Sequence, residues 1–182
     1  MPVAERIELA DRVTLSLVRQ GDAGGVPMLL LHGVTDSWRS FEPVLPHLPG
    51  SIHAIAVSQR GHGDSDRPHS GYRTADYAAD VSAFLDAAGI ERAVVVGHSM
   101  GATNAQRLAI DRPERVRGLV LAGSFASYRD NPMVTEFWDS AVSRLEDPID
   151  PAFVRGFQES TLARPVGSVA ADLVAFVHTL AG

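Results

Sequence analysis

Four short, mainly apolar runs limit this chain to one class of fold. Each run has four or five residues, and a glycine follows it within four residues. Continuous apolar runs of this length are typical of strands that are covered on both faces. The runs are Met28–Leu31, His53–Val57, Ala93–Val96 and Leu119–Ala122.

Helical patterns lie between these runs. Thr74 is expected to be the N-cap of one helix, and Gly101–Asp111 predicts a second. Strands that alternate with helices predict an α/β fold with a mostly parallel sheet. Residues 6–22 alternate in polarity and predict an antiparallel pair of opening strands. After Ser124 the alternation stops and only helix signals remain.

The composition argues against several kinds of partner. The formal net charge is −6, and no Lys/Arg run is present, so we expect no nucleic-acid or membrane partner. The chain has no cysteine, which excludes disulfides and thiolate metal sites. We expect a cytoplasmic protein, because no apolar run approaches the ~20 residues that span a bilayer. No residue spacing indicates a metal or cofactor site.

A G-x-S-x-G motif, Gly97 to Gly101, follows the run Val94–Val96. A tight turn from strand to helix lifts its serine clear of the sheet, and side chains at the two glycines would collide with neighbouring elements. The pattern predicts Ser99 as a catalytic nucleophile. The alternative is a glycine-rich turn with a bystander serine.

A second turn, His32-Gly33, ends the run Met28–Leu31. A backbone N–H that becomes free at such a turn can bind a developing oxyanion, together with the N–H after the nucleophile. The expected donors are the backbone amides of Val34 and Met100.

The chain resembles the α/β-hydrolase superfamily, in particular its esterase-like and C–C-hydrolase-like members with a serine nucleophile. The resemblance covers Val3 to about Ser124 and rests on "LLLHGVTDSW", "AVSQRGHGDSDRP", "YAADVSAFLDAAGIERAVVVGHSMGA" and "RPERVRGLVLAGS". It implies a cofactor-independent hydrolase of carboxylic esters or related acyl bonds in a small apolar substrate. Ser99 speaks against the epoxide-hydrolase and dehalogenase branches, which use aspartate at this position.

The resemblance also implies a division of the chain. Residues 1–124 correspond to the core sheet and its helices, and residues 125–166 to a partial helical lid. Residues 167–182 resemble the final helix of the family. The last two strands of the family sheet, which carry the triad acid and histidine, have no counterpart. Either an internal block is missing at Gly167-Ser168, or Val169–Leu180 is another lid helix and the chain stops early.

The triad acid and base therefore remain unassigned. His62 is the least unsuitable substitute base, whereas His98 is expected to pack under the turn and His32 to brace the backbone. Asp36 is expected to cap the helix that follows it, and Asp130 to lie in a turn. The remaining histidines are expected at the surface or near a helix end: His47, His53, His69 and His178.

Two expectations follow from this deficit. Loss of a catalytic triad costs about 10⁶-fold in rate, so the isolated chain is either a very slow hydrolase or a non-catalytic remnant that binds apolar ligands. The strand Val116–Ala122 would also become an apolar border strand, through which a homodimer could form. A further departure is Ser58, where the family has an aspartate, and we expect it to loosen the loop that follows.

Overall fold

A computed structural model describes residues 3–125, 131–146 and 149–161 of the 182 residues. Residues 1–124 and 125–182 form two compact units, which are described separately. None of the described helices is long and apolar enough to cross a membrane.

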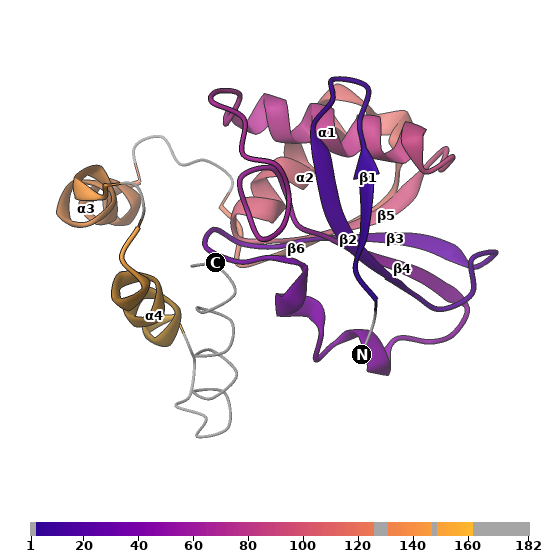
Figure 1. Ribbon diagram of the computed structural model, residues 1–182, viewed down its shortest axis with the longest axis horizontal. Coiled ribbons are helices and arrows are strands. Elements are labelled where there is room, and N and C mark those ends of the chain that lie inside the picture. The colour runs from indigo at the N-terminus through magenta and orange to yellow at the C-terminus, as the bar shows by residue number, and fades with distance from the viewer. Residues whose placement is uncertain (1–2, 126–130, 147–148, 162–182) are drawn as a thin grey trace. The chain divides into compact units, whose positions relative to one another are not determined.

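The first unit contains a six-stranded sheet, and its strand order in the described residues is β1-β2-β4-β3-β5-β6 (Figure 1). Strands β3, β4, β5 and β6 run parallel to one another. Strands β1 and β2 form the antiparallel opening pair, and β2 also pairs antiparallel with β4. The α/β fold with a mostly parallel sheet is therefore confirmed. The strands are β1 (Glu5–Glu8), β2 (Thr14–Gln20), β3 (Val26–Leu31), β4 (Ile52–Val57), β5 (Ala93–His98) and β6 (Val116–Ala122).

Different elements cover the two faces of the sheet. Helices α1 (Thr74–Ala87) and α2 (Met100–Asp111) pack together on one face (Figure 1). The 3₁₀ segments η1 (Trp38–Phe41) and η2 (Leu45–His47) cover the other face. Leu29 and Leu31 of β3 therefore pack beneath the helices, while Leu30 contributes to the opposite core. This double cover explains why the inner strands are continuous apolar runs.

The start of α1 differs in detail from the expectation. Thr74 is the first helical residue rather than the N-cap, which is Arg73. The Asp76 carboxylate accepts a hydrogen bond from the Arg73 N–H at 2.8 Å. The Asp76 side chain, at the third helical position, therefore satisfies the N–H group of the N-cap residue.

A buried ion pair joins the loop after β4 to helix α1. The Arg60 guanidinium makes two hydrogen bonds to the two carboxylate oxygens of Asp80. The two side chains are 8% and 6% exposed. The Asp80 carboxylate raises the pKa of Arg60, so the guanidinium stays charged. Arg60 also donates to the Gly71 carbonyl at 3.0 Å and lies 3.3 Å from Asp11.

The expected loosening at Ser58 is wrong. Ser58 is fully buried, and its hydroxyl accepts a hydrogen bond from the Trp38 N–H at 3.1 Å. The Ser65 hydroxyl donates to the Ser58 carbonyl at 2.7 Å and accepts from the Ser16 N–H at 2.8 Å. These hydrogen bonds hold the loop after β4 in place.

The second unit contains two described helices, α3 (Pro132–Ser140) and α4 (Pro151–Ser160), and the 3₁₀ segment η4 (Val142–Arg144). Pro151 is the first residue of α4, a position where the missing N–H of proline costs nothing. The rings of Phe137 and Phe157 lie 5.4 Å apart between their centroids, so α3 and α4 contact each other. Asp130 and His178, as well as the proposed junction at Gly167-Ser168 and the segment Val169–Leu180, lie outside the described residues.

Strand β6 forms one border of the sheet. It pairs with β5, and no described residue pairs with its other side. Leu119, Val120 and Leu121 are 39%, 49% and 41% exposed. An apolar border strand is a template for pairing with another chain, and we propose that a second copy of this chain pairs there.

We expect Val120→Lys to weaken this self-association, because a charge on a border strand opposes edge-to-edge pairing. Sedimentation velocity over a range of protein concentrations measures the effect as a lower average mass. Ile110→Lys is the matched control, since Ile110 is 75% exposed on α2. A wild-type chain that stays monomeric at all concentrations would contradict the proposal.

Candidate active site

Ser99 lies at the turn between β5 and α2. Its backbone has φ 50° and ψ −115°, a strained conformation that few residues other than glycine adopt. The Ser99 N–H donates to the Ala122 carbonyl of β6 at 2.9 Å, and its carbonyl accepts from the Ala102 N–H at 3.0 Å. Helix α2 begins at Met100. The positive end of its dipole therefore lies next to the serine.

The two glycines of the motif allow the close packing of this turn. A Cβ atom on Gly97 would lie 2.4 Å from the Gly101 carbonyl oxygen. A Cβ atom on Gly101 would lie 2.2 Å from the Leu31 carbonyl oxygen at the end of β3. Both obstacles are backbone atoms, which cannot move aside without displacing a strand or a helix. The absence of side chains here lets α2 approach the sheet.

The turn after β3 lies against the serine. A Cβ atom on Gly33 would be 3.3 Å from the Ser99 Cβ atom and 3.1 Å from Nδ1 of His98. Val34 is 41% exposed, and Met100 is partly buried. The structure therefore brings the segment that carries the Val34 amide next to the segment that carries the Met100 amide.

His32 is fully buried and holds this turn in place. Its Nδ1 atom donates to the Gly33 carbonyl at 2.7 Å, and its Nε2 atom accepts from the Gln59 N–H at 2.9 Å. This assignment follows from the hydrogen-bond pattern, since Nε2 faces a backbone donor. Burial, followed by the nearby His62 ring, lowers the pKa of His32 to about 3. His32 is therefore neutral, but its Nε2 lone pair already accepts the Gln59 N–H, so this ring is not free to accept the proton of Ser99.

Gln59 and Asn104 join three elements at the site, and sequence reasoning missed both residues. The Gln59 amide donates to the His32 carbonyl at 2.9 Å, and its oxygen accepts from the Asn104 amide at 2.7 Å. Asn104 lies on α2 and is 2% exposed. A polar residue on the inner face of α2 was the available signal, because a buried amide requires a hydrogen-bonding partner.

The candidate bases do not reach Ser99 by any hydrogen bond in the described part of the chain. His62 Nδ1 donates to the Arg60 carbonyl at 2.9 Å, and burial lowers the pKa of His62. His98 is exposed, contrary to the expectation that it packs under the turn. A Cβ atom on Gly123 would lie 3.6 Å from its ring, so the imidazole lies between the backbones of Gly33 and Gly123.

Two other expectations about polar residues are wrong. Ser37, not Asp36, caps η1, because the Ser37 side chain accepts a hydrogen bond from the Arg39 N–H. Asp36 is instead buried with 8% exposure, beside the Gly33 turn. His53 is buried with 9% exposure rather than at the surface, and this burial lowers its pKa. His47 and His69 are exposed, as expected.

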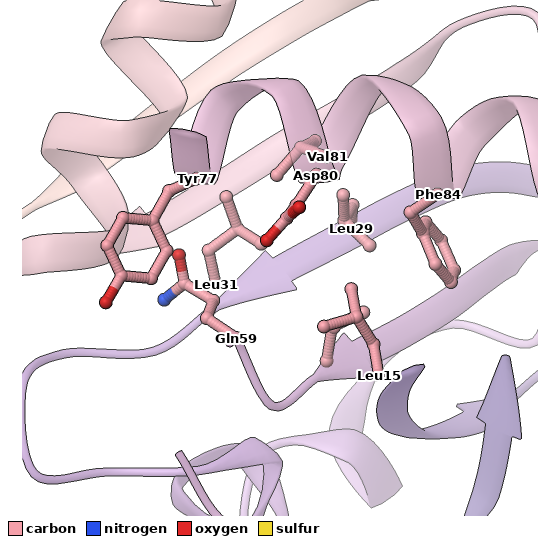
Figure 2. A pocket seen from close by; sticks show the side chains of 9 residues that line it. Leu15, Leu29, Leu31, Gln59, Tyr77, Asp80, Val81 and Phe84 are labelled. Carbon is pink, nitrogen blue, oxygen red and sulfur yellow. The ribbon is translucent and has the colours of Figure 1, made fainter. Parts of the chain in front are cut away.

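A small cavity lies beneath α1 (Figure 2). Its volume is about 10 Å³, at the lower limit for one water molecule. Tyr77, Asp80 and Gln59 bring polar atoms to a lining that is otherwise aliphatic and aromatic. The cavity is too small for an ester substrate. In the described residues, no group of three or more acidic or histidine side chains could hold a metal ion.

Comparison with known proteins places this arrangement among the α/β hydrolases. A family model described as "alpha/beta hydrolase fold" matches residues 26–181. The chain is 36% identical over 143 residues to a 2-(acetamidomethylene)succinate hydrolase of Mesorhizobium japonicum, a match that covers 79% of this chain and 49% of the relative. Epoxide hydrolase B of Mycobacterium tuberculosis is 39% identical over 102 residues, with 54% and 29% covered.

The solved structures agree with this family match. The crystal structure of a hydrolase from Pseudomonas aeruginosa PA01 superimposes with a TM-score of 0.80 and 25% identity, over 97% of this chain and 67% of that one. The chain spans about half the length of the first curated relative and less than a third of the second.

Proposed function

Because this chain belongs to the α/β-hydrolase fold family, we propose that it is a serine hydrolase of carboxylic esters or related acyl bonds in a small apolar substrate. The conformation of Ser99 supports this proposal most strongly. A strained backbone at a strand-to-helix turn persists only where the surroundings impose it, and such strain concentrates at functional sites. The epoxide-hydrolase branch carries an aspartate at this position, whereas this chain carries a hydroxyl group.

In the proposed reaction, Oγ of Ser99 attacks the carbonyl carbon of the ester. The carbonyl oxygen gains negative charge, which the amides of Val34 and Met100 and the N-terminus of α2 stabilise. The C–O bond to the alcohol breaks, and the proton lost from Oγ ends on the alcohol that leaves. Water then attacks the acyl carbon, which releases the carboxylic acid and returns a proton to Oγ of Ser99. His32 contributes indirectly, because its hydrogen bond to the Gly33 carbonyl fixes the peptide that precedes Val34.

The proposed reaction of the chain alone is slow. Ser99 needs a base to accept its proton, and no hydrogen bond to its hydroxyl occurs within the described residues. Oxyanion stabilisation and binding without the triad leave about 10³–10⁴-fold acceleration over water. The same observation favours a second candidate function, the binding of apolar ligands without turnover.

Ser99→Ala distinguishes these two functions. We expect the wild-type chain to be labelled by a fluorophosphonate and acylated by p-nitrophenyl acetate, and Ser99→Ala to lose both reactions. Mass spectrometry of the intact protein and release of p-nitrophenol measure them. Ser70→Ala, at an exposed loop position, is the matched control and should react as the wild type does. Labelling without turnover would favour binding alone, and labelling that survives in Ser99→Ala would show that Ser99 is not the nucleophile.

Ser99→Ala should also change the stability little. The strained turn depends on Gly97 and Gly101, and no described residue forms a hydrogen bond with the Ser99 hydroxyl. We expect the free energy of unfolding to change by less than about 1 kcal/mol, as measured by urea denaturation. A loss of several kcal/mol would show that the hydroxyl supports the fold.

A further inference from the structure

Asp36 is a buried carboxylic acid beside the proposed nucleophile, and neither the fold nor the proposed reaction uses it. A Cβ atom on Gly33 would lie 3.5 Å from Oδ2 of Asp36 and 3.3 Å from Cβ of Ser99. The Asp36 side chain therefore lies on the same side of the Gly33 turn as the serine. It does not cap η1, since Ser37 has that role.

The Asp36 carboxyl has no hydrogen-bond donor among the residues that the structure describes. Only its backbone N–H is engaged, in a 3.3 Å hydrogen bond to the Gly33 carbonyl. Asp36 is 8% exposed, and its oxygens are not among the fully buried unpaired atoms of the described residues, so the carboxyl still reaches solvent at this turn. Its partial burial nevertheless makes the ionised form costly, and such groups concentrate at functional sites. A buried acid that faces a reaction site is available to a ligand.

The groups around Asp36 carry no compensating positive charge. His32 is neutral because both ring nitrogens are engaged, and His62 packs against His32 with ring centroids 5.0 Å apart. His98 is the other titratable group at the turn. Arg39, the nearest cation in sequence, stacks on Trp38 and pairs with Glu42. Burial alone raises the pKa of Asp36 to about 7.

We propose that Asp36 is a specificity-determining residue of this site, which contacts the acyl group of the substrate and restricts it to groups without negative charge. This proposal rests on the proposed function of Ser99. An ionised Asp36 repels an anionic acyl group that is bound at Ser99. A protonated Asp36 instead donates a hydrogen bond to a polar substituent. An unpaired charge that opposes the wrong ligand is a common source of specificity.

The preference for an uncharged acyl group should depend on pH. The test compares p-nitrophenyl butyrate with p-nitrophenyl hemisuccinate, which differ mainly in one terminal carboxylate. We expect the ratio of their acylation rate constants to rise about tenfold or more in favour of the butyrate between pH 6 and pH 8. Asp36→Asn should abolish this rise, because the amide does not ionise. His98→Gln should retain it, which excludes titration of that imidazole as the cause.

Two outcomes overturn the proposal while leaving the proposed function intact. One is a wild-type ratio that does not change with pH although acylation of Ser99 occurs. The other is an unchanged rise in Asp36→Asn. If Ser99 reacts with neither ester, the proposed function fails, and binding of butyramide and succinamate, followed by NMR, tests Asp36 without any reaction. The same pH-dependent preference for butyramide supports the proposal, and its absence overturns it.

A stability measurement checks the burial of Asp36 independently of activity. A carboxyl with a raised pKa stabilises the folded chain below the unfolded value of 3.8, and this contribution is lost as the pH rises through about 7. Asp36→Asn lacks this loss. We therefore expect the urea midpoints of the two proteins to be similar near pH 4, and the variant to become the more resistant one towards pH 7.5. Midpoints that run parallel over this range would show that Asp36 is not buried in the way described.

Discussion

Gly101→Ala is expected to cost at least about 3 kcal/mol of folding free energy, the upper end for overpacking a protein interior. The added methyl group would lie 2.2 Å from the Leu31 carbonyl oxygen and 2.7 Å from the His32 carbonyl oxygen. Relief requires α2 to move away from the end of β3. Urea denaturation of the wild type and the variant measures the loss.

The same displacement should reduce the reactivity of Ser99 in any molecules that remain folded. Moving α2 changes the position of the Met100 amide relative to the Val34 amide, and oxyanion stabilisation depends on both positions. Gly50→Ala is the matched control, because a Cβ atom there meets nothing within 4 Å. We expect the control to stay within about 0.5 kcal/mol of the wild type. A stable, fully reactive Gly101→Ala protein would contradict the described packing of the turn.

Asp80→Ala is expected to destabilise the chain by about 3–5 kcal/mol, because it leaves the Arg60 guanidinium buried without its main partner. Asp11, 3.3 Å from Arg60, compensates little, since its side chain is 52% exposed. Asp111→Ala breaks an exposed pair with Arg107 and is the matched control. Exposed pairs at this helical spacing contribute only about 0.3–0.5 kcal/mol.

A double-variant cycle isolates the interaction between the two side chains. Arg60→Met combined with Asp80→Leu should cost less than the sum of the two single losses, because no unpaired charge remains. Free energies of unfolding from urea titrations supply all four corners of the cycle. Additive losses would show that the two side chains do not act as a pair.

The sheet could be predicted because its strands are buried on both faces. Strand β3 has three consecutive leucines, and their side chains alternate between the two cores. Leu29 and Leu31 pack into one core and Leu30 into the other. The antiparallel pair β1 and β2 could also be predicted, since its residues alternate in polarity. The position of the strand-to-helix turn at Ser99 followed from the glycines, which permit a backbone that larger residues resist.

The polar details of the site could not be predicted, because they depend on residues far apart in the chain. Asp36 and Ser37 are both good capping residues, and local sequence does not decide which side chain faces the helix. Gln59 meets Asn104 across a separation of 45 residues. His98 was expected in the interior, but its ring is exposed and lies between Gly33 and Gly123, which follow the ends of β3 and β6 and have no side chains to cover it.

Hydrogen exchange at the backbone N–H of Gln59 can be used to test whether the site is folded. This N–H donates a hydrogen bond to Nε2 of the buried His32 ring. The Gln59 side-chain oxygen accepts a second hydrogen bond from Asn104 on α2. Exchange of the N–H with deuterated solvent therefore requires β3, β4 and α2 to separate at their shared end, an opening with a free energy near that of global unfolding. In each variant, a slowly exchanging NMR cross-peak of the Gln59 backbone amide would show that the end of the sheet around Ser99 is still folded.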